Sequence, residues 1–114
     1  MEQRYLNVVV LSDAMAWSVR IEDERGQLVR DLGVITVLDK LWTDADKAGF
    51  PWITTIDPYG DTTFNYRQLI HVVVELDQLA SLCERSDEQD QIRQLARWMR
   101  EMPDRHLYFK LYGD

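Results

Sequence analysis

Hydrophobic and polar residues alternate in two stretches of the chain, one near each end. Every second position is apolar in residues 17–22, and residues 107–112 show the same alternation. A period of two is typical of a β-strand with one buried and one solvated face. We therefore predict a strand in each stretch, and a return strand over residues 27–32 that forms a hairpin with the first.

Three further stretches are predicted to be extended. Residues 5–11 are rich in β-branched residues, and residues 52–56 form a short apolar run after a proline. Residues 62–65 follow a turn and continue in extended form. β-branched and aromatic residues fit a pleated, half-buried surface, which favours strands in these stretches.

Helical spacing of apolar residues marks residues 33–49, residues 66–85 and a last helix that begins at Ser86 and ends before Pro103. Ser86 and Gln89 match the capping-box pattern at a helix start. The inner face of the helix over residues 66–85 consists of Leu69, Val72, Val73, Leu76, Leu79, Ala80 and Cys83, widened by Ile70 and Val74. A face this wide predicts cover by the sheet on one side and by another helix on the other.

These elements predict an α+β fold, with a mainly antiparallel sheet of about five strands and three helices packed over one face. The chain has 114 residues, close to the commonest domain size, so residues 1–114 are predicted to form a single domain. The pattern does not determine the order of the strands.

The charge of the chain narrows the classes of partner that we expect it to bind. It carries 20 acidic and 13 basic residues, a formal net charge of −7, which disfavours nucleic acid and favours a basic protein partner. No apolar run approaches the ~18 residues that would span a bilayer, and the first residues do not resemble a signal peptide. We expect no membrane association and a cytoplasmic location.

Residues that could carry chemistry are few. Cys83 is the only cysteine and is expected to be a small core residue. His71 and Glu75 are spaced to touch along one helix, where we expect an exposed pair. No nucleophile, phosphate-binding or zinc motif is present, so we predict no enzyme, no metal and no cofactor.

The turn at residues 57–61, with sequence Asp-Pro-Tyr-Gly-Asp, concentrates the unusual residues. Pro58 presets one backbone angle, and Gly60 is expected to tolerate a left-handed conformation. Three interpretations compete: a structural turn held by aspartate side chains, a divalent-cation site, and a loop that contacts a partner. For the last interpretation the candidate binding residues are Asp57, Tyr59, Asp61 and Asn65.

The turn also carries a resemblance. The run from Asp57 to Asn65, followed by Gln68, resembles a group of small uncharacterised bacterial proteins that share an Asp-Pro-Tyr-Gly-Asp-Thr turn, then Phe-Asn and Gln. The C-terminal aromatic stretch at residues 106–114 is similar to theirs. In its size, single domain and acidity the chain is also similar to immunity proteins, which neutralise toxins of competing bacteria. The similarity to immunity proteins implies a protein partner, and no catalytic residue is carried over from either resemblance.

The leading functional prediction is therefore a non-enzymatic acidic binding protein, most specifically an immunity-type inhibitor of a basic bacterial toxin or enzyme. One alternative is a small-molecule-binding or metabolic protein with a pocket between the sheet and the long helix. Another is a structural or assembly subunit, for example a homodimer joined through an exposed sheet edge.

Overall fold

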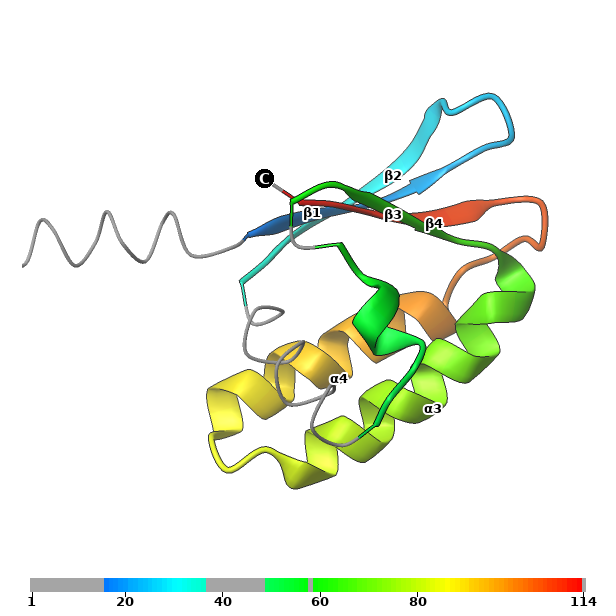
Figure 1. Cartoon of the computed structure of the whole chain (residues 1–114). Helices are drawn as coiled ribbons and strands as arrows, with labels where there is room; N and C mark the ends of the chain where they lie inside the picture. Colours follow the sequence, from blue (N-terminus) through cyan, green and yellow to red (C-terminus); the bar gives the residue numbers. More distant parts are fainter. Residues whose placement is uncertain (1–15, 37–48, 58, 114) are drawn as a thin grey trace, which may run out of the picture.

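The structure is a computed structural model that describes residues 16–36, 49–57 and 59–113. Figure 1 shows the elements in chain order. They are β1 (Trp17–Glu22), β2 (Leu28–Ile35), the short 3₁₀ helix η1 (Ile53–Thr55), β3 (Asp61–Phe64), α3 (Tyr66–Leu82), α4 (Ser86–Arg100) and β4 (Tyr108–Tyr112).

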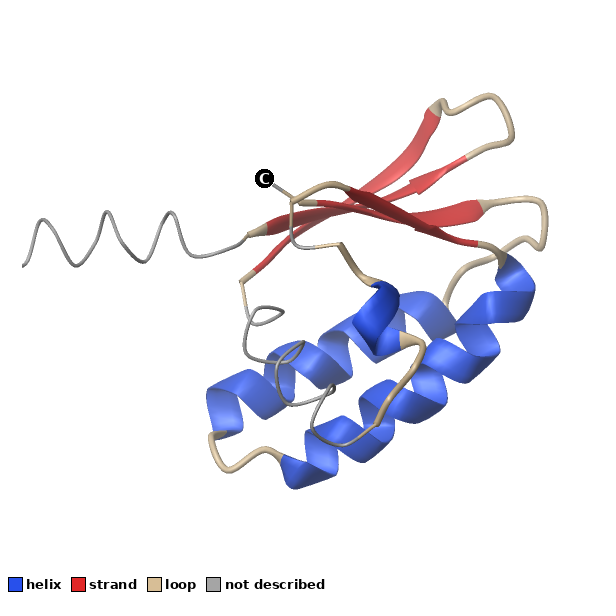
Figure 2. Cartoon of the chain, in the orientation of Figure 1, coloured by secondary structure: helices blue, strands red, loops and turns tan. Residues whose placement is uncertain are grey.

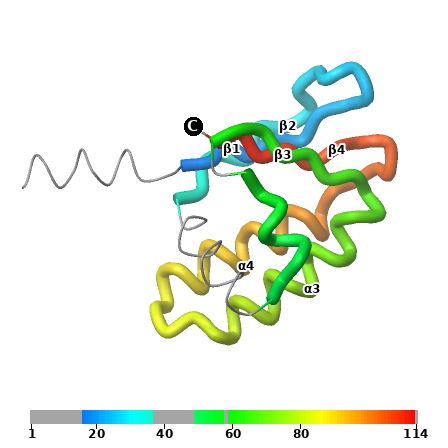
Figure 3. The backbone as a smooth tube through the Cα atoms, viewed as in Figure 1, coloured from blue at the N-terminus to red at the C-terminus, as the bar shows by residue number. Residues whose placement is uncertain are grey.

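The four described strands form one antiparallel sheet in the order β2-β1-β4-β3. The hairpin β1–β2 turns at Gly26, which has a φ of +79°, and the Asp23 carboxylate accepts hydrogen bonds from the backbone N–H groups of Arg25 and Gln27. The last strand then enters the middle of the sheet, between β1 and β3, as the chain path in Figure 3 shows. This position brings the C-terminal strand beside both the hairpin and the turn before β3.

Helices α3 and α4 lie on one face of the sheet (Figure 2). The inward residues of the strands, among them Ile21, Phe109 and Leu111, are buried there together with Leu76 and Leu79 of α3 and the apolar residues of α4. Cys83 is partly buried and packs against this core. The α+β class, the antiparallel sheet, the helices over one face and the burial of Leu76 are confirmed.

The element counts and some boundaries differ from the prediction. The described residues contain four strands and two α-helices, where about five strands and three helices were expected. Residues 52–56 were predicted as a strand, but the 3₁₀ helix η1 lies there. Val34 and Ile35 extend β2 instead of starting a helix. The predicted strand over residues 5–11 and most of the predicted helix over residues 33–49 lie outside the described residues.

Both helices start at the predicted residues, Tyr66 and Ser86, but the cap of the second differs from expectation. At Ser86 the capping-box prediction is wrong, because α4 has Arg85 as its N-cap and no side-chain cap bond. Gln89 instead donates its side-chain amide to the carbonyl of Ala80, 2.7 Å away. A complete capping box forms at α3, where Asn65 and Gln68 each accept a bond from the backbone N–H of the other. Such a cap stabilises a helix by about 1 kcal/mol.

Ile70 and Val74 were expected to be covered by a neighbouring helix, and this is wrong. Both side chains are exposed on the outer side of α3. The sheet and α4 together cover only the narrower stripe that includes Leu69, Val73 and Leu76. None of the described helices is both long enough and apolar enough to cross a membrane.

Candidate functional site

The turn between η1 and β3 is fixed at both ends by hydrogen bonds. The buried Trp17 donates its indole N–H to the carbonyl of Asp57 at 3.0 Å, and the backbone N–H of Asp57 donates to Thr62 Oγ1 at 2.8 Å. The N–H of Gly113, just after β4, donates to the carbonyl of Gly60 at 2.9 Å. The turn is therefore tied to β1, β3 and the end of β4. Pro58 lies outside the described residues.

Two of the four predicted site residues have structural roles. The Asp57 carboxylate accepts the backbone N–H of Tyr59 at 2.9 Å, which is the Asx turn expected for a structural aspartate. Asn65 is the N-cap of α3, and its side chain is engaged in the capping box. Both residues are exposed, but their polar groups are already used in holding the chain.

The other two predicted site residues are presented to solvent. The side chain of Tyr59 is 74% exposed at the turn. Asp61 is also exposed, and it begins β3 opposite Tyr112 of β4. Asp61 alternates with the buried Thr62 and Phe64, so it lies on the sheet face away from the helices. The structure thus separates the four residues into two with structural roles, Asp57 in the turn and Asn65 at the start of α3, and two that are available for contact.

Gly60 has a role in the turn other than the predicted one. Positive φ angles in the described residues occur at Gly26, Gly33 and Gly49, and Gly60 is not among them. A Cβ atom built on Gly60 would lie 2.8 Å from Asp57 Oδ2 and 3.3 Å from Asp57 Cγ. The glycine therefore makes room for the carboxylate that closes the turn.

This arrangement predicts coupling between the two positions. Gly60→Ala should push the Asp57 carboxylate away from the Tyr59 N–H and lower the free energy of unfolding by about 1 kcal/mol, the net value of one hydrogen bond. In an Asp57→Ala background the same substitution should cost much less, because the obstructing side chain is gone. A double-mutant cycle of denaturant midpoints measures this coupling. Additive effects of the two substitutions would contradict the steric explanation.

Beside this turn, the open face of the sheet carries a cluster of Arg20, Glu22, Lys110 and Tyr112, which we call the sheet-face cluster. The Tyr112 hydroxyl donates to Glu22 Oε2, and Lys110 Nζ lies 3.3 Å from Glu22 Oε1. Arg20 Cζ and Lys110 Nζ lie 5.5 and 5.7 Å from the centre of the Tyr112 ring. These side chains cover Glu22, which is only 4% exposed although it shares a face with outward-pointing residues.

Two members of the sheet-face cluster, Tyr112 and Lys110, have raised pKa values. Burial raises the pKa of Tyr112, and the hydrogen bond and the charge of Glu22 raise it further. Burial alone would lower the pKa of Lys110, but the hydrogen bond and attraction to Glu22, with a smaller contribution from Tyr112, raise it overall. A nucleophilic or basic lysine or tyrosine needs the opposite shift, so these shifts do not favour catalysis at the cluster.

These shifts predict a loss of stability in alkali. Both folded-state pKa values are raised above the ordinary 10.0 of tyrosine and 10.5 of lysine. The folded state therefore releases these protons later than the unfolded chain, and the stability held at lower pH decreases as the pH rises through this range. Glu22→Gln should make this decrease in stability at high pH smaller. Urea midpoints measured between about pH 8 and about pH 11 test this expectation.

Glu24→Gln is the matched control, because Glu24 is exposed and its ion-pair partner is His106, 3.4 Å away. That variant should retain the alkaline decrease of the wild type. Equal decreases in Glu22→Gln and wild type would mean that Glu22 does not set the proton affinity of the cluster.

His71 and Glu75 do not form the exposed pair that their spacing predicted. Glu75 is buried and accepts the backbone N–H groups of Trp52 and Ile53, each at 2.9 Å, at the start of η1. His71 is exposed and stacks on Trp52, with ring centroids 5.1 Å apart and planes 7° from parallel. Glu75 is thus a structural carboxylate that attaches η1 to α3. Within the described part of the chain, no three His, Cys, Asp or Glu residues are grouped so that they could hold a metal ion.

The chain matches no protein-family model, no curated protein sequence and no solved structure. The resemblance carried by the turn and the C-terminal strand therefore stays a prediction. The sheet-face cluster was not predicted. Its only sequence signal is that Glu22, Lys110 and Tyr112 occupy outward positions of two alternating strands, and pairing of those strands brings them together.

Proposed function

We propose that this chain is a non-enzymatic binding protein that recognises a basic protein surface through Tyr59 and Asp61. The observation that carries the proposal is the exposure of the Tyr59 side chain on a turn fixed by hydrogen bonds to Trp17, Thr62 and Gly113. A turn that is already ordered loses little conformational freedom on binding. Tyrosine is also among the residues that most often dominate interface energies.

Charge supports a basic partner. The chain has a formal net charge of −7, and the exposed Asp61 lies two residues from Tyr59 at the start of β3. Opposite charges at the edge of an interface attract the partner before contact and raise the association rate. The specific form that we propose is an immunity-type inhibitor, whose partner is a basic bacterial toxin or enzyme.

The non-enzymatic part of the proposal rests on two observations. The sheet-face cluster combines a tyrosine and a lysine whose pKa values are shifted away from reactivity. In the turn, the carboxylate of Asp57 already accepts a hydrogen bond from the N–H of Tyr59. Asp57 and Asp61 therefore do not form an enclosed pair of the kind that general acid–base catalysis needs.

The test begins with capture of partners by immobilised protein from a lysate of the source cells, followed by association kinetics with each purified partner. The partner should be basic, and Asp61→Asn should slow its association at low salt with a smaller effect at high salt. Asp90→Asn is the control, because Asp90 is an exposed carboxylate on α4. An acidic partner, or equal association rates for the two variants, would refute the proposal.

A further inference from the structure

The sheet has β2 and β3 as its edge strands, and the two edges differ in how they are protected. β2 departs from regular pairing with β1 at two places, beside Arg20 and beside Glu22. Bulges of this kind twist an edge strand and hinder the pairing of a further strand with it. β3 pairs with β4 in one unbroken register, and its sequence, Asp-Thr-Thr-Phe, contains neither lysine nor proline. β3 is therefore the edge that is open to another strand.

The register identifies the backbone groups that β3 leaves unpaired. The N–H of Gly113 donates to the carbonyl of Gly60, and hydrogen-bonded pairs alternate along an antiparallel ladder. Every second residue after Gly60 therefore bonds to β4. The residues between them, Asp61 and Thr63, direct their N–H and C=O groups away from the sheet, where no described strand pairs with β3.

This edge is short and has a defined end. It ends at Asn65, whose N–H donates to the Gln68 side chain and whose carbonyl accepts the N–H of Leu69. Before that point Asp61 and Thr63 each offer one donor and one acceptor of the backbone, and both residues are exposed. The edge also begins directly after the turn proposed as the binding site. An extended segment is the ligand whose own backbone groups match this arrangement.

We propose that an extended segment of the partner protein adds to β3 as a further antiparallel strand, with a lysine or arginine opposite Asp61. Such pairing satisfies the outward backbone groups of Asp61 and Thr63. A cation directly across from Asp61 forms a favourable cross-strand pair, and a β-branched residue suits the position across from Thr63. The inference rests on the proposed function, because it states how the partner recognised by Tyr59 and Asp61 is held.

Charge disfavours a second copy of this chain as the added strand. A two-fold axis at Thr62 would place the Asp61 carboxylates of the two copies at diagonal positions of the new ladder, where the residues lie about 7–8 Å apart. Each copy also has a net charge of −7, and like charges disfavour association. A segment with a cation opposite Asp61 replaces this repulsion by attraction.

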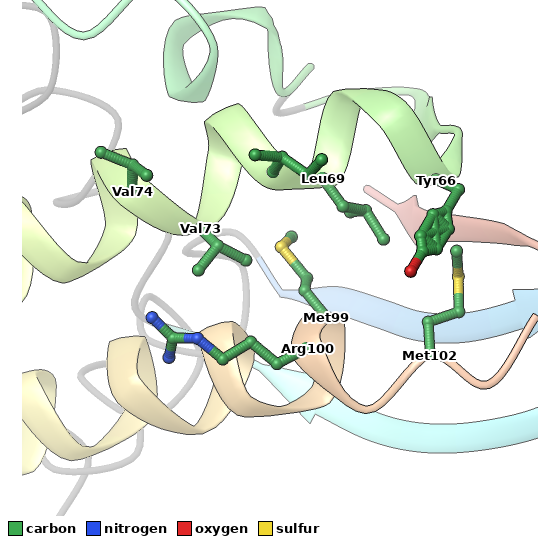
Figure 4. Close-up of a pocket in the computed structure, with 8 residues that line it drawn as sticks. Tyr66, Leu69, Val73, Val74, Met99, Arg100 and Met102 are labelled. Carbon is green, nitrogen blue, oxygen red and sulfur yellow. The ribbon is translucent and has the colours of Figure 1, made fainter. Parts of the chain in front are cut away.

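The hollow between α3 and α4 is a second surface that the test has to separate from the β3 edge. It has a volume of about 360 Å³, and Val73 and Met99 are among the residues that line it (Figure 4). Arg100 beside it already pairs with Asp77. The backbone groups within α3 and α4 are bonded inside each helix, so the hollow has no unpaired edge for an extended segment. Ile70, which also lines the hollow, provides the control.

The test is a selection of short displayed random peptides on the intact wild-type protein. Enriched peptides should be rich in β-branched residues and share a lysine or arginine. When such a peptide is bound, hydrogen exchange should slow at the outward amides of Asp61 and Thr63 and should stay unchanged at Thr62, which faces β4. N-methylation of the peptide backbone should abolish binding only at alternate positions, those whose N–H groups face β3.

Thr63→Pro removes an outward N–H without removing a bond to β4, and proline is tolerated at such an edge position. Peptide affinity, measured by fluorescence anisotropy, should fall about tenfold or more. Thr63→Val is the matched control, because it keeps the N–H. Ile70→Glu is the control for the hollow, since the Ile70 side chain is 64% exposed there. Both controls should bind like the wild type. Melting temperatures establish folding, and exchange and N-methylation decide the question if Thr63→Pro does not fold.

The inference is overturned by a selection that enriches no peptide, by unchanged exchange at Asp61 and Thr63 in the complex, or by equal losses in Thr63→Pro and Ile70→Glu. It is also overturned if sedimentation shows a wild-type dimer that Thr63→Pro dissociates. Failure of the proposed function gives a different result. Slowed exchange at Asp61 and Thr63 with unchanged affinity of Tyr59→Ala supports the added strand and removes Tyr59 as the anchor.

Discussion

Leu76→Ala is expected to lower the free energy of unfolding by about 2–5 kcal/mol, the range for a buried leucine truncated to alanine. Leu76 is 0% exposed, in the part of α3 that faces the sheet. Its removal takes apolar contacts from both layers and leaves a cavity that the surrounding strands and helices cannot fully close. Denaturant midpoints measure the loss.

Leu82→Ala is the control, since it removes the same atoms from a leucine of α3 that is 63% exposed. That change should alter stability by less than about 0.5 kcal/mol. If the two variants have equal midpoints, the face of α3 that is assigned to the core is incorrect.

Glu75→Ala is expected to cost about 1–3 kcal/mol, because it leaves buried backbone N–H groups without an acceptor. The Glu75 carboxylate accepts both the Trp52 and Ile53 N–H groups, and Ile53 is buried. Glu75→Gln should lose less, since its carbonyl oxygen can still accept one of these bonds. Hydrogen exchange at Trp52 and Ile53 should accelerate in the alanine variant, which localises the effect to η1.

Glu84→Ala is the control for this prediction, because Glu84 is an exposed carboxylate just after α3. It should leave both the unfolding midpoint and the exchange of these two amides unchanged. Equal stability of the Glu75→Ala and Glu84→Ala variants would mean that the Glu75 carboxylate does not hold η1.

The hydrogen bonds that Glu75 accepts from the start of η1 explain why residues 52–56 were predicted incorrectly. Ile53 and the threonines after it are β-branched, which favours a strand when only local preferences count. A carboxylate far along the chain supplies the acceptor at the start of η1, and this tertiary contact favours the helical turn. Sequence spacing along α3 reveals that His71 and Glu75 are neighbours, but it does not reveal that Glu75 points inward.

Local patterns were sufficient where one buried face determines the element. The alternation in β1 and β4 predicted both strands and their inward residues. The place of β4 in the centre of the sheet was not predictable, because strand order depends on pairings between distant segments. The sheet-face cluster was missed for the same reason, since Glu22 and Tyr112 meet only through that pairing.

The capping-box pattern occurs at the start of both helices, but the box forms at only one of them, and there it was not predicted. Asn65 and Gln68 fit the pattern of an N-cap residue followed three positions later by glutamine, and the box forms. Ser86 and Gln89 fit it equally well, but Gln89 bonds the Ala80 carbonyl instead. That contact joins α3 and α4, so packing of the two helices outweighs the local cap.

For the turn, the sequence predicted where the candidate residues lie, but not which of them are structural and which are available for contact. Asp57 and Asn65 are as polar as Asp61, and only their hydrogen bonds identify them as structural. Gly60 was expected to have an unusual backbone angle, whereas its role is to leave room for the Asp57 side chain. These distinctions depend on distances of a few ångströms, which residue types do not specify.

Binding through Tyr59 is tested most directly by the dissociation constant of Tyr59→Ala for the captured basic partner, measured beside its melting temperature. A role of Tyr59 as anchor predicts an unchanged melting temperature, because the Tyr59 side chain is 74% exposed and none of its described hydrogen bonds involves the ring hydroxyl. It predicts a loss of affinity of about thirtyfold or more, equivalent to about 2 kcal/mol for an aromatic anchor. Wild-type affinity in a folded Tyr59→Ala variant would show that Tyr59 is not the anchor and that the turn has only a structural role.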